Sequence, residues 1–468
     1  MSALRKWEVS YMSDTKGNGR KLMAFVGIAI INFMTMYLIA GAGIYAYNIA
    51  GAFDAVASVS IIFTLESVGR CVMMPLSGKI ADHFGLKRVF LFAVIIYTVF
   101  TALSAFATGF WMFAIAHMIT GFAWGLFMTN ILAMIPHIFG ADTAPKYAGI
   151  AQSMTTVAMI VSSPVAGILC AFNWRLEFAI ALPILIVGFI LCAVAIPNIP
   201  KSESEGGRMD IGGCVGTIIA LMPFCLAMNF GNALGWTSPI ILGLIALVVV
   251  GLIILFVVER KATEPIYPAK LLKKRYYLSI FIISLLCAII SSVSNYIPAY
   301  SQSVLGASSA IAGMITVPSL IIASILTVVL GNVVAKTGKY KGIVVFWTVC
   351  ELITGVLFLF VNPMQAAGAS FTLAFVIISV TPLGAMNGVQ QFVPYTYPMK
   401  VLKPQEIAGG MAFMALGGSL GGTIANGVVG ALMNAMGFGS IFYLPFICGI
   451  VMLIFTFIFK DVKQGESI

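Results

Sequence analysis

Long apolar segments alternate with short polar ones along the whole chain. Each apolar segment is roughly 20 residues long, enough for a helix to cross the roughly 30 Å hydrocarbon core of a bilayer. The segments do not show the alternation over about 10 residues that marks a transmembrane β-strand. The pattern predicts transmembrane helices at 22–43, 55–77, 89–108, 112–136, 147–171, 177–196, 210–230, 238–257, 277–299, 308–332, 342–361, 368–392, 406–432 and 439–459.

The composition agrees with these fourteen spans. The 468 residues are 60% hydrophobic and 9% charged, whereas soluble proteins carry about 25% charged residues. We therefore predict an all-α polytopic protein in the lipid bilayer. The eight cysteines lie in or beside apolar segments without a CxxC pair, which favours small buried apolar residues. Residues 1–21 are polar and basic, and we expect a cytoplasmic tail rather than a cleaved signal peptide.

Basic residues collect on one side of the predicted spans. When loops are assigned alternately to the two sides, all 26 Lys and Arg except Arg70 and Arg175 fall on the side of the N-terminus. Arg70 lies within a span, and Arg175 lies on the other side. Because cytoplasmic loops collect Lys and Arg, both termini are predicted to be cytoplasmic, in a cell membrane. The net charge of +10 follows from this topology, and we expect no nucleic-acid partner.

A polar turn occurs twice. Residues 78–88 follow the second span, and a weaker copy at 331–341 follows the tenth. Six spans per half would place the second copy after the eighth, so two extra spans must separate two related halves. Parallel halves of this kind are typical of secondary transporters, whose binding site lies at their interface. The predicted organisation is a tail (1–21), a six-helix bundle (22–196), two linker helices with their loops (197–276), a second six-helix bundle (277–459) and a tail (460–468).

The first turn resembles the signature of the major facilitator superfamily, G-x-L-A-D-R-x-G-R-K. His83 and Leu86 stand where the family has arginines, and the matching residues are Gly78, Ala81, Asp82, Gly85 and Lys87. The resemblance implies the major facilitator fold. It also implies that this turn, with Gly78, Asp82, Gly85, Lys87 and Arg88, helps to control the switch between inward-open and outward-open states. Asp82 would suit a neighbouring helix N-terminus, where the helix dipole favours an anion.

Further segments extend the resemblance over nearly the whole chain. Residues 117–125 are similar to the motif R-x-x-Q-G-x-G, with His117 and Thr120 at the first two named positions. Residues 163–167 are similar to the antiporter motif G-P-x-x-G-G, with Ser163 and Ala166 in place of glycines, and 173–178 resemble the W-R-W-x-F entry to the sixth span. The residues that resemble the fourteen-helix drug:proton antiporter branch are Tyr296, Pro298, Tyr300, Gln302, Gly306 and Gly313.

Four ionisable residues lie at membrane depth, where they are costly and mark candidate functional sites. They are Glu66, Arg70, His117 and Glu351. Glu66 is near the middle of its span and shares a helix face with Arg70, four residues later. We consider all four candidates for proton coupling or substrate binding. A structural ion pair is the alternative for Glu66 and Arg70, and an ordinary hydrogen bond is the alternative for His117.

Uncharged polar residues give further cavity candidates: Asn32, Asn295, Asn387, Gln390 and Gln391. Such groups can also simply join helices, each contributing about 0.6 kcal/mol. The glycine-rich segment 409–430 lacks the Lys-Ser/Thr of a phosphate-binding loop, so close helix packing is the better interpretation. We expect no cofactor and no metal, and energy from an ion gradient or from the substrate itself.

The pattern favours a secondary active transporter that works by alternating access. The first hypothesis is proton-coupled export of amphipathic or drug-like small molecules. The alternative is a proton symporter that takes up an organic anion, for which Arg70 is suited. A membrane enzyme would need a cluster of reactive side chains at a water boundary, and three scattered histidines do not supply one. A channel more typically repeats one pore element by oligomerisation. We expect a monomer whose partners are protons and a small-molecule substrate.

Overall fold

The computed structural model describes residues 15–139, 144–197, 211–259, 275–365, 368–390, 393–394, 396–397 and 407–460. Fourteen helices in these ranges are long and apolar enough to cross a membrane, which confirms the predicted spans and the all-α class. The α-helices are α2 (Thr15–Ala52), α3 (Val59–Phe84), α4 (Leu86–Ala105), α5 (Phe110–Phe139), α6 (Ala144–Phe172), α7 (Arg175–Ala195), α8 (Ile211–Leu234), α9 (Pro239–Glu259), α11 (Arg275–Ser294), α12 (Ile297–Ser303), α13 (Ser309–Met314), α14 (Val317–Thr337), α15 (Lys341–Leu359), α16 (Val361–Gln365), α17 (Ala369–Gln390), α19 (Ile407–Met436) and α20 (Tyr443–Ile458).

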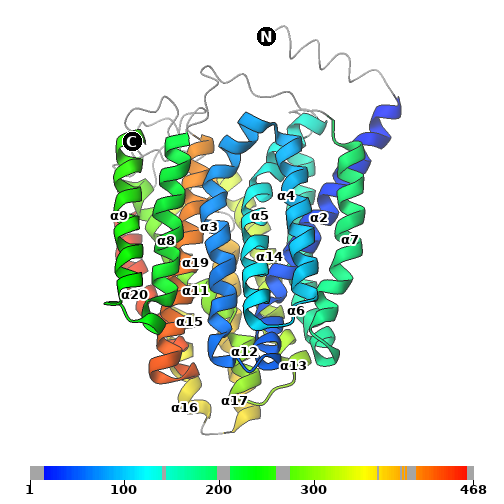
Figure 1. The fold of residues 1–468 in the computed structure, drawn as a ribbon. Coiled ribbons are helices and arrows are strands. Elements are labelled where there is room, and N and C mark those ends of the chain that lie inside the picture. Colours follow the sequence, from blue (N-terminus) through cyan, green and yellow to red (C-terminus); the bar gives the residue numbers. More distant parts are fainter. Residues whose placement is uncertain are drawn as a thin grey trace.

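Equivalent helix pairs recur in the two halves of the chain. Helix α3 packs on α5 and α2 packs on α6, while α14 packs on α17 and α11 packs on α19. The halves meet where α3 contacts α19 and where α6 contacts α13. Helices α8 and α9 stand at one edge of the bundle (Figure 1), where α8 packs on α3 and α19 and α9 packs on α8. The two extra helices therefore lie outside the repeated pairs.

Helix α2 begins and α20 ends at the same face of the bundle, which we call the termini face (Figure 1). The other end is the opposite face. The loop between α2 and α3 and the loop between α12 and α13 both lie at the opposite face, because each span, broken or continuous, crosses the bundle once.

Two of the predicted spans are broken rather than continuous. The span at 277–299 divides into α11 and α12 around Asn295, and the span at 308–332 divides into α13 and α14 around Thr316. Pro298 and Pro318 each lie in the first turn of the helix after the break, where the missing N–H leaves no helix hydrogen bond unmade. Irregular backbone at membrane depth is tolerated where it is buried in protein or lines a water-filled cavity.

Candidate functional site

A cavity of about 370 Å³ lies between the two halves. Helices α2, α3, α5 and α6 line it on one side, and α11, α14, α17 and α19 line it on the other. The volume is within the roughly 300–1,000 Å³ typical of small-molecule sites. Four of the predicted candidates line this cavity: Arg70, Asn295, Asn387 and Gln390.

Glu66 and Arg70 form an ion pair along one face of α3. The Arg70 Nη2 atom lies 3.4 Å from Glu66 Oε2, and the two side chains are 26% and 6% exposed, respectively. The guanidinium carbon of Arg70 lies 5.5 Å from the centre of the Trp124 ring. Arg70 lines the cavity whereas Glu66 does not. The cationic end of the pair therefore faces the cavity, and the carboxylate lies behind it.

Close packing fixes the backbone of α3 at this pair. A Cβ atom at Gly121 of α5 would overlap the carbonyl oxygen of Glu66, so only glycine fits without a shift. The second half repeats the arrangement, because a Cβ atom at Gly384 of α17 would overlap the carbonyl oxygen of Ser319 in α14. Ser319 precedes Gly331 by the same 12 residues that separate Glu66 from Gly78. Ser319, which lines the cavity, is thus the positional counterpart of Glu66.

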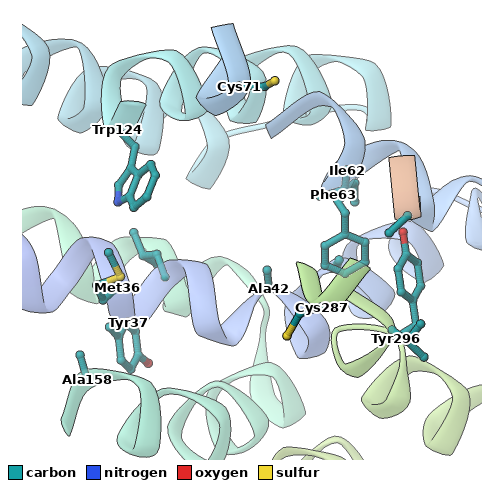
Figure 2. Packing of buried hydrophobic residues seen from close by; sticks show 14 of the residues in the cluster. Met36, Tyr37, Ala42, Ile62, Phe63, Cys71, Trp124, Ala158, Cys287 and Tyr296 are labelled. Atoms are coloured by element: carbon teal, nitrogen blue, oxygen red, sulfur yellow. The ribbon is translucent and has the colours of Figure 1, made fainter. Parts of the chain in front are cut away.

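A hydrogen-bonded chain joins the ion pair to the other half. Ser67 Oγ accepts hydrogen bonds from Arg70 Nη2 at 3.3 Å and from Asn426 Nδ2 of α19 at 3.2 Å. The Tyr296 hydroxyl, at the break between α11 and α12, donates to Asn426 Oδ1 at 3.1 Å. Figure 2 shows Tyr296 beside Phe63 of α3, with ring centroids 4.9 Å apart. The state of Arg70 is therefore linked to contacts between the halves.

Several residues of this site were not predicted from the sequence, among them Asn426 and Trp124. Asn426 lies in the glycine-rich helix α19, whose glycines drew attention to packing rather than to its polar residue. Trp124 extends from α5 toward α2 (Figure 2) and lines the cavity. Its indole N–H has no hydrogen-bond acceptor within the described ranges. A polar residue among glycines and an aromatic residue one turn after Thr120 were the available signals.

The wall formed by the second half carries amide side chains. Ser291 Oγ lies 2.7 Å from Asn387 Oδ1 and 2.8 Å from Gln390 Oε1. A hydroxyl has a single hydrogen to donate, so one of the two amides must present its nitrogen to Ser291 instead. Asn295, at the helix break, is exposed to the cavity. This wall therefore offers both donors and acceptors to a bound molecule.

His117 is buried beside the ion pair rather than in the cavity lining. Its Nε2 atom lies 3.3 Å from the Tyr45 hydroxyl, and its Nδ1 atom lies 3.4 Å from Thr120 Oγ1. Its ring stacks on Phe113 with centroids 5.3 Å apart. His117 also interacts electrostatically with Glu66. The residue in the position of the motif arginine is thus held by Tyr45 and Thr120 within the first half.

Two buried carboxyl groups lie away from the cavity. Glu351 of α15 has no exposed surface, and neither carboxyl oxygen has a hydrogen-bond partner in the part of the chain that the structure describes. Glu177, which was not among the predicted candidates, accepts a hydrogen bond from the Tyr37 hydroxyl at 3.0 Å. Glu177 was missed because the sequence places it at a span boundary, where a charge is unremarkable, whereas α7 begins at Arg175.

The remaining polar candidates have other positions. Asn32 Nδ2 donates to Thr155 Oγ1 at 2.7 Å and to the Ala151 carbonyl at 3.2 Å, so this residue joins α2 to α6. Asn32 is not among the residues that line the cavity. Gln391 lies outside the described residues.

Both copies of the polar turn use their second glycine to end a helix. Gly85 after α3 has φ of 97°, and Gly338 after α14 has φ of 62°. Glycine adopts such backbone angles without the steric cost that a Cβ atom brings. A Cβ atom at Gly78 would meet no atom within 4 Å, so the first glycine answers no packing requirement in this state.

The lysine of each turn caps the C-terminus of the last helix in its own half. Lys87 Nζ donates to the Ile196 carbonyl at 2.6 Å, just after α7, and Lys341 Nζ donates to the Phe459 carbonyl at 2.5 Å, just after α20. A cation at a helix C-terminus satisfies carbonyl groups that have no partner within the helix and complements the helix dipole. Arg88 is exposed, and the side chain of Asp82 lies outside the described residues.

The halves are packed together on the side of the opposite face. A Cβ atom at Gly313 of α13 would overlap the Ser163 carbonyl oxygen, and one at Gly167 of α6 would lie 2.6 Å from the Ser309 carbonyl oxygen. Near the same end, Asn48 Nδ2 donates to Gln302 Oε1 at 3.3 Å. The segment 163–167 thus forms a direct contact between the halves.

The sequence is similar to those of known proteins. The sequence profile described as "Major Facilitator Superfamily" matches residues 25–399. The "Multidrug transporter protein MdtP" of Bacillus subtilis (strain 168) is 25% identical over 432 residues, which cover 91% of this chain and 77% of that protein. The "Vacuolar membrane amino acid uptake transporter fnx2" of Schizosaccharomyces pombe is 26% identical over 311 residues, which cover 64% of this chain and 53% of that protein.

A solved structure of another protein has a similar fold. The crystal structure of a POT family transporter in complex with 5-aminolevulinic acid superposes with a TM-score of 0.71 at 14% identity. The superposition covers 93% of this chain and 94% of that one. The arrangement of the helices around the cavity is therefore shared with a protein of very different sequence.

Proposed function

Because the chain belongs to the major facilitator superfamily, we propose that it is a proton-coupled secondary transporter. It moves small molecules through the cavity between its halves by alternating access. The observation that carries this proposal is the Glu66–Arg70 pair, whose cationic end lines the cavity. Because this titratable pair lies beside the interface between the halves, binding of a proton to it can change the equilibrium between the two conformations.

The coupling step begins at Glu66. Protonation removes the counter-charge of Arg70, whose Nη2 atom also donates to Ser67 Oγ. Ser67 accepts a second hydrogen bond from Asn426 of the other half, so a movement of Arg70 changes a link between the halves. Proton binding then has different free energies in the two states, as any coupling requires.

Two directions of transport are candidates. The name of the Bacillus subtilis relative, a multidrug transporter, supports export of amphipathic or drug-like compounds. Uptake together with a proton is the second candidate. It is favoured by Arg70, the one charged side chain among the described residues that line the cavity.

Flux in proteoliposomes tests the proposed function. With an imposed pH gradient and the membrane potential clamped, we expect the purified protein to concentrate labelled benzoate or the dye ethidium above the level in protein-free liposomes, which benzoic acid crosses by itself, and a protonophore to abolish this excess. The orientation of the effective gradient distinguishes uptake from export. Flux that ignores the gradient would contradict proton coupling, and chemical conversion of the probe would indicate an enzyme.

We further propose that the protein is a monomer in the cell membrane with both termini in the cytoplasm. In the sequence, Lys and Arg fall on the side of the N-terminus when the loops are assigned alternately to the two sides, as expected for cytoplasmic loops. Single cysteines introduced at Ala307 and Lys273 should therefore be labelled by an impermeant maleimide from opposite sides of the membrane. The eight native cysteines are all buried, which keeps background labelling low. Labelling of both positions from one side would overturn this topology.

A further inference from the structure

We infer that the substrate is a small organic anion whose far end carries hydrogen-bonding groups. Its anionic group binds Arg70, and its far end reaches the amides of the second half. This inference rests on the proposed transport function and names the substrate class of the same cavity. It is carried by three observations: the charge of the lining, the unused donors of Arg70, and the amides opposite.

The described lining of the cavity contains one cation and no carboxylate. Among its described lining residues, Arg70 is charged and the other polar ones are hydroxyl and amide residues. Glu66, the partner of Arg70, is 6% exposed and lies behind it. Electrostatic interactions are stronger away from bulk water, so a cationic substrate is repelled here and an anionic one attracted. A lipophilic cation would find no carboxylate in this lining.

Arg70 retains donors that the protein does not use. Both of its polar contacts, with Glu66 and with Ser67, involve Nη2. Its Nη1 and Nε atoms have no acceptor within the described ranges. The side chain is 26% exposed, so these donors can be reached from the cavity. The Trp124 ring lies under the guanidinium group and limits its orientation. A planar group held with free N–H donors is suited to a carboxylate.

The opposite wall would bind the far end of the same molecule. Ser291 engages Asn387 and Gln390 by one atom of each amide, and the other amide atom of each has no partner among the described residues. Asn295 presents a third amide at the helix break. A substrate with hydroxyl, amide or amino-acid-like groups at its far end would therefore contact both halves at once.

Protonation of Glu66 and binding of the anion favour each other. The groups that act on Glu66 are Arg70 on its own helix, His117 on α5, Tyr45 on α2 and Tyr97 on α4. Arg70 is the cation among them, and ionised Glu66 competes with the substrate for it. A proton on Glu66 ends this competition, so one proton and one anion bind together. This linkage favours the uptake direction.

Three isosteric probes of different charge test the inference: benzoate, benzamide and benzamidinium. Binding to the full-length protein in detergent micelles is measured by tryptophan fluorescence and by the thermal unfolding midpoint. Charge-assisted hydrogen bonds predict that benzoate binds about tenfold or more tightly than benzamide, with benzamidinium weakest. Glu66→Gln should tighten benzoate binding at pH 8, because Arg70 is then free. Arg70→Gln should abolish the preference for benzoate.

Two further variants serve as controls for Arg70→Gln. Arg175→Gln removes an arginine that also lies over a tryptophan, 4.3 Å from the ring of Trp174, but outside the cavity lining, so it should change nothing. If Arg70→Gln does not fold, the double variant Glu66→Gln/Arg70→Gln removes both charges together. The inference is overturned if the three probes show no charge preference, if benzamidinium matches benzoate, or if the double variant keeps the preference. Proton-driven flux that persists in that case leaves the transport function standing.

Discussion

Glu66→Gln should abolish the accumulation of substrate driven by a pH gradient while downhill exchange continues. The amide has the shape of the protonated acid and cannot lose a proton, so the variant stays in one protonation state through the whole cycle. Arg70 then has no ionised partner at position 66 at any stage of the cycle. With one proton per substrate, a gradient of one pH unit supports about tenfold accumulation, and the variant should show a ratio close to one.

Accumulation and counterflow are measured in the same proteoliposomes for the parent and the variant. Glu177→Gln is the matched control, because Glu177 is also a buried carboxyl group but does not line the cavity or contact Arg70. It should preserve accumulation. A Glu66→Gln variant that still concentrates substrate like the parent would show that the ion pair is structural. Glu351, fully buried in the second half, would then be the next residue to replace.

Gly313→Leu should prevent the halves from closing at the opposite face and should abolish transport without unfolding the protein. A side chain at this position overlaps the Ser163 carbonyl oxygen across the interface between the halves. Overpacking costs about 1–3 kcal/mol. Because the strain exists in the closed state and is relieved when the halves separate, it shifts the equilibrium by roughly 5–150-fold toward the state open on that side.

Accessibility of the cavity reports this shift. A cysteine at Asn295, which lines the cavity, should react faster with an impermeant reagent added at the opposite face when Gly313→Leu is also present. Gly243→Leu on α9 is the control, since a Cβ atom there meets nothing within 4 Å. Unchanged reactivity together with normal transport in the Gly313 variant would show that α6 and α13 do not form the closing contact.

The sequence predicted the number of spans because each helix must be apolar for the length of a bilayer. It did not predict the breaks around Asn295 and Thr316, because Pro298 and Pro318 lie within apolar segments that continue past them. A proline in a transmembrane segment is compatible with a kinked or a broken helix. The choice depends on neighbouring helices, which the local sequence does not contain.

The depth of a polar residue was predictable, but its direction was not. Arg70 and Glu351 both lie near the middle of a span, yet the first lines the cavity and the second is buried within the second half. In a soluble helix the polar face marks the side away from the core. In a membrane helix the lipid and the protein interior are both apolar, so periodicity does not identify the face that meets the cavity. Asn426 was missed for the same reason.

Glu66 lies against Gly121, and its positional counterpart Ser319 lies against Gly384. These matching contacts separate the packing of the helices from the charge that one of them carries. Both halves use the same glycine contact to hold their helices, but only the first carries an ion pair at that position. The second half can therefore change its cavity-facing amides and hydroxyls without disturbing the ion pair, to which we assign proton coupling. A duplicated scaffold with one charged copy leaves the polar residues of the other half free to diversify.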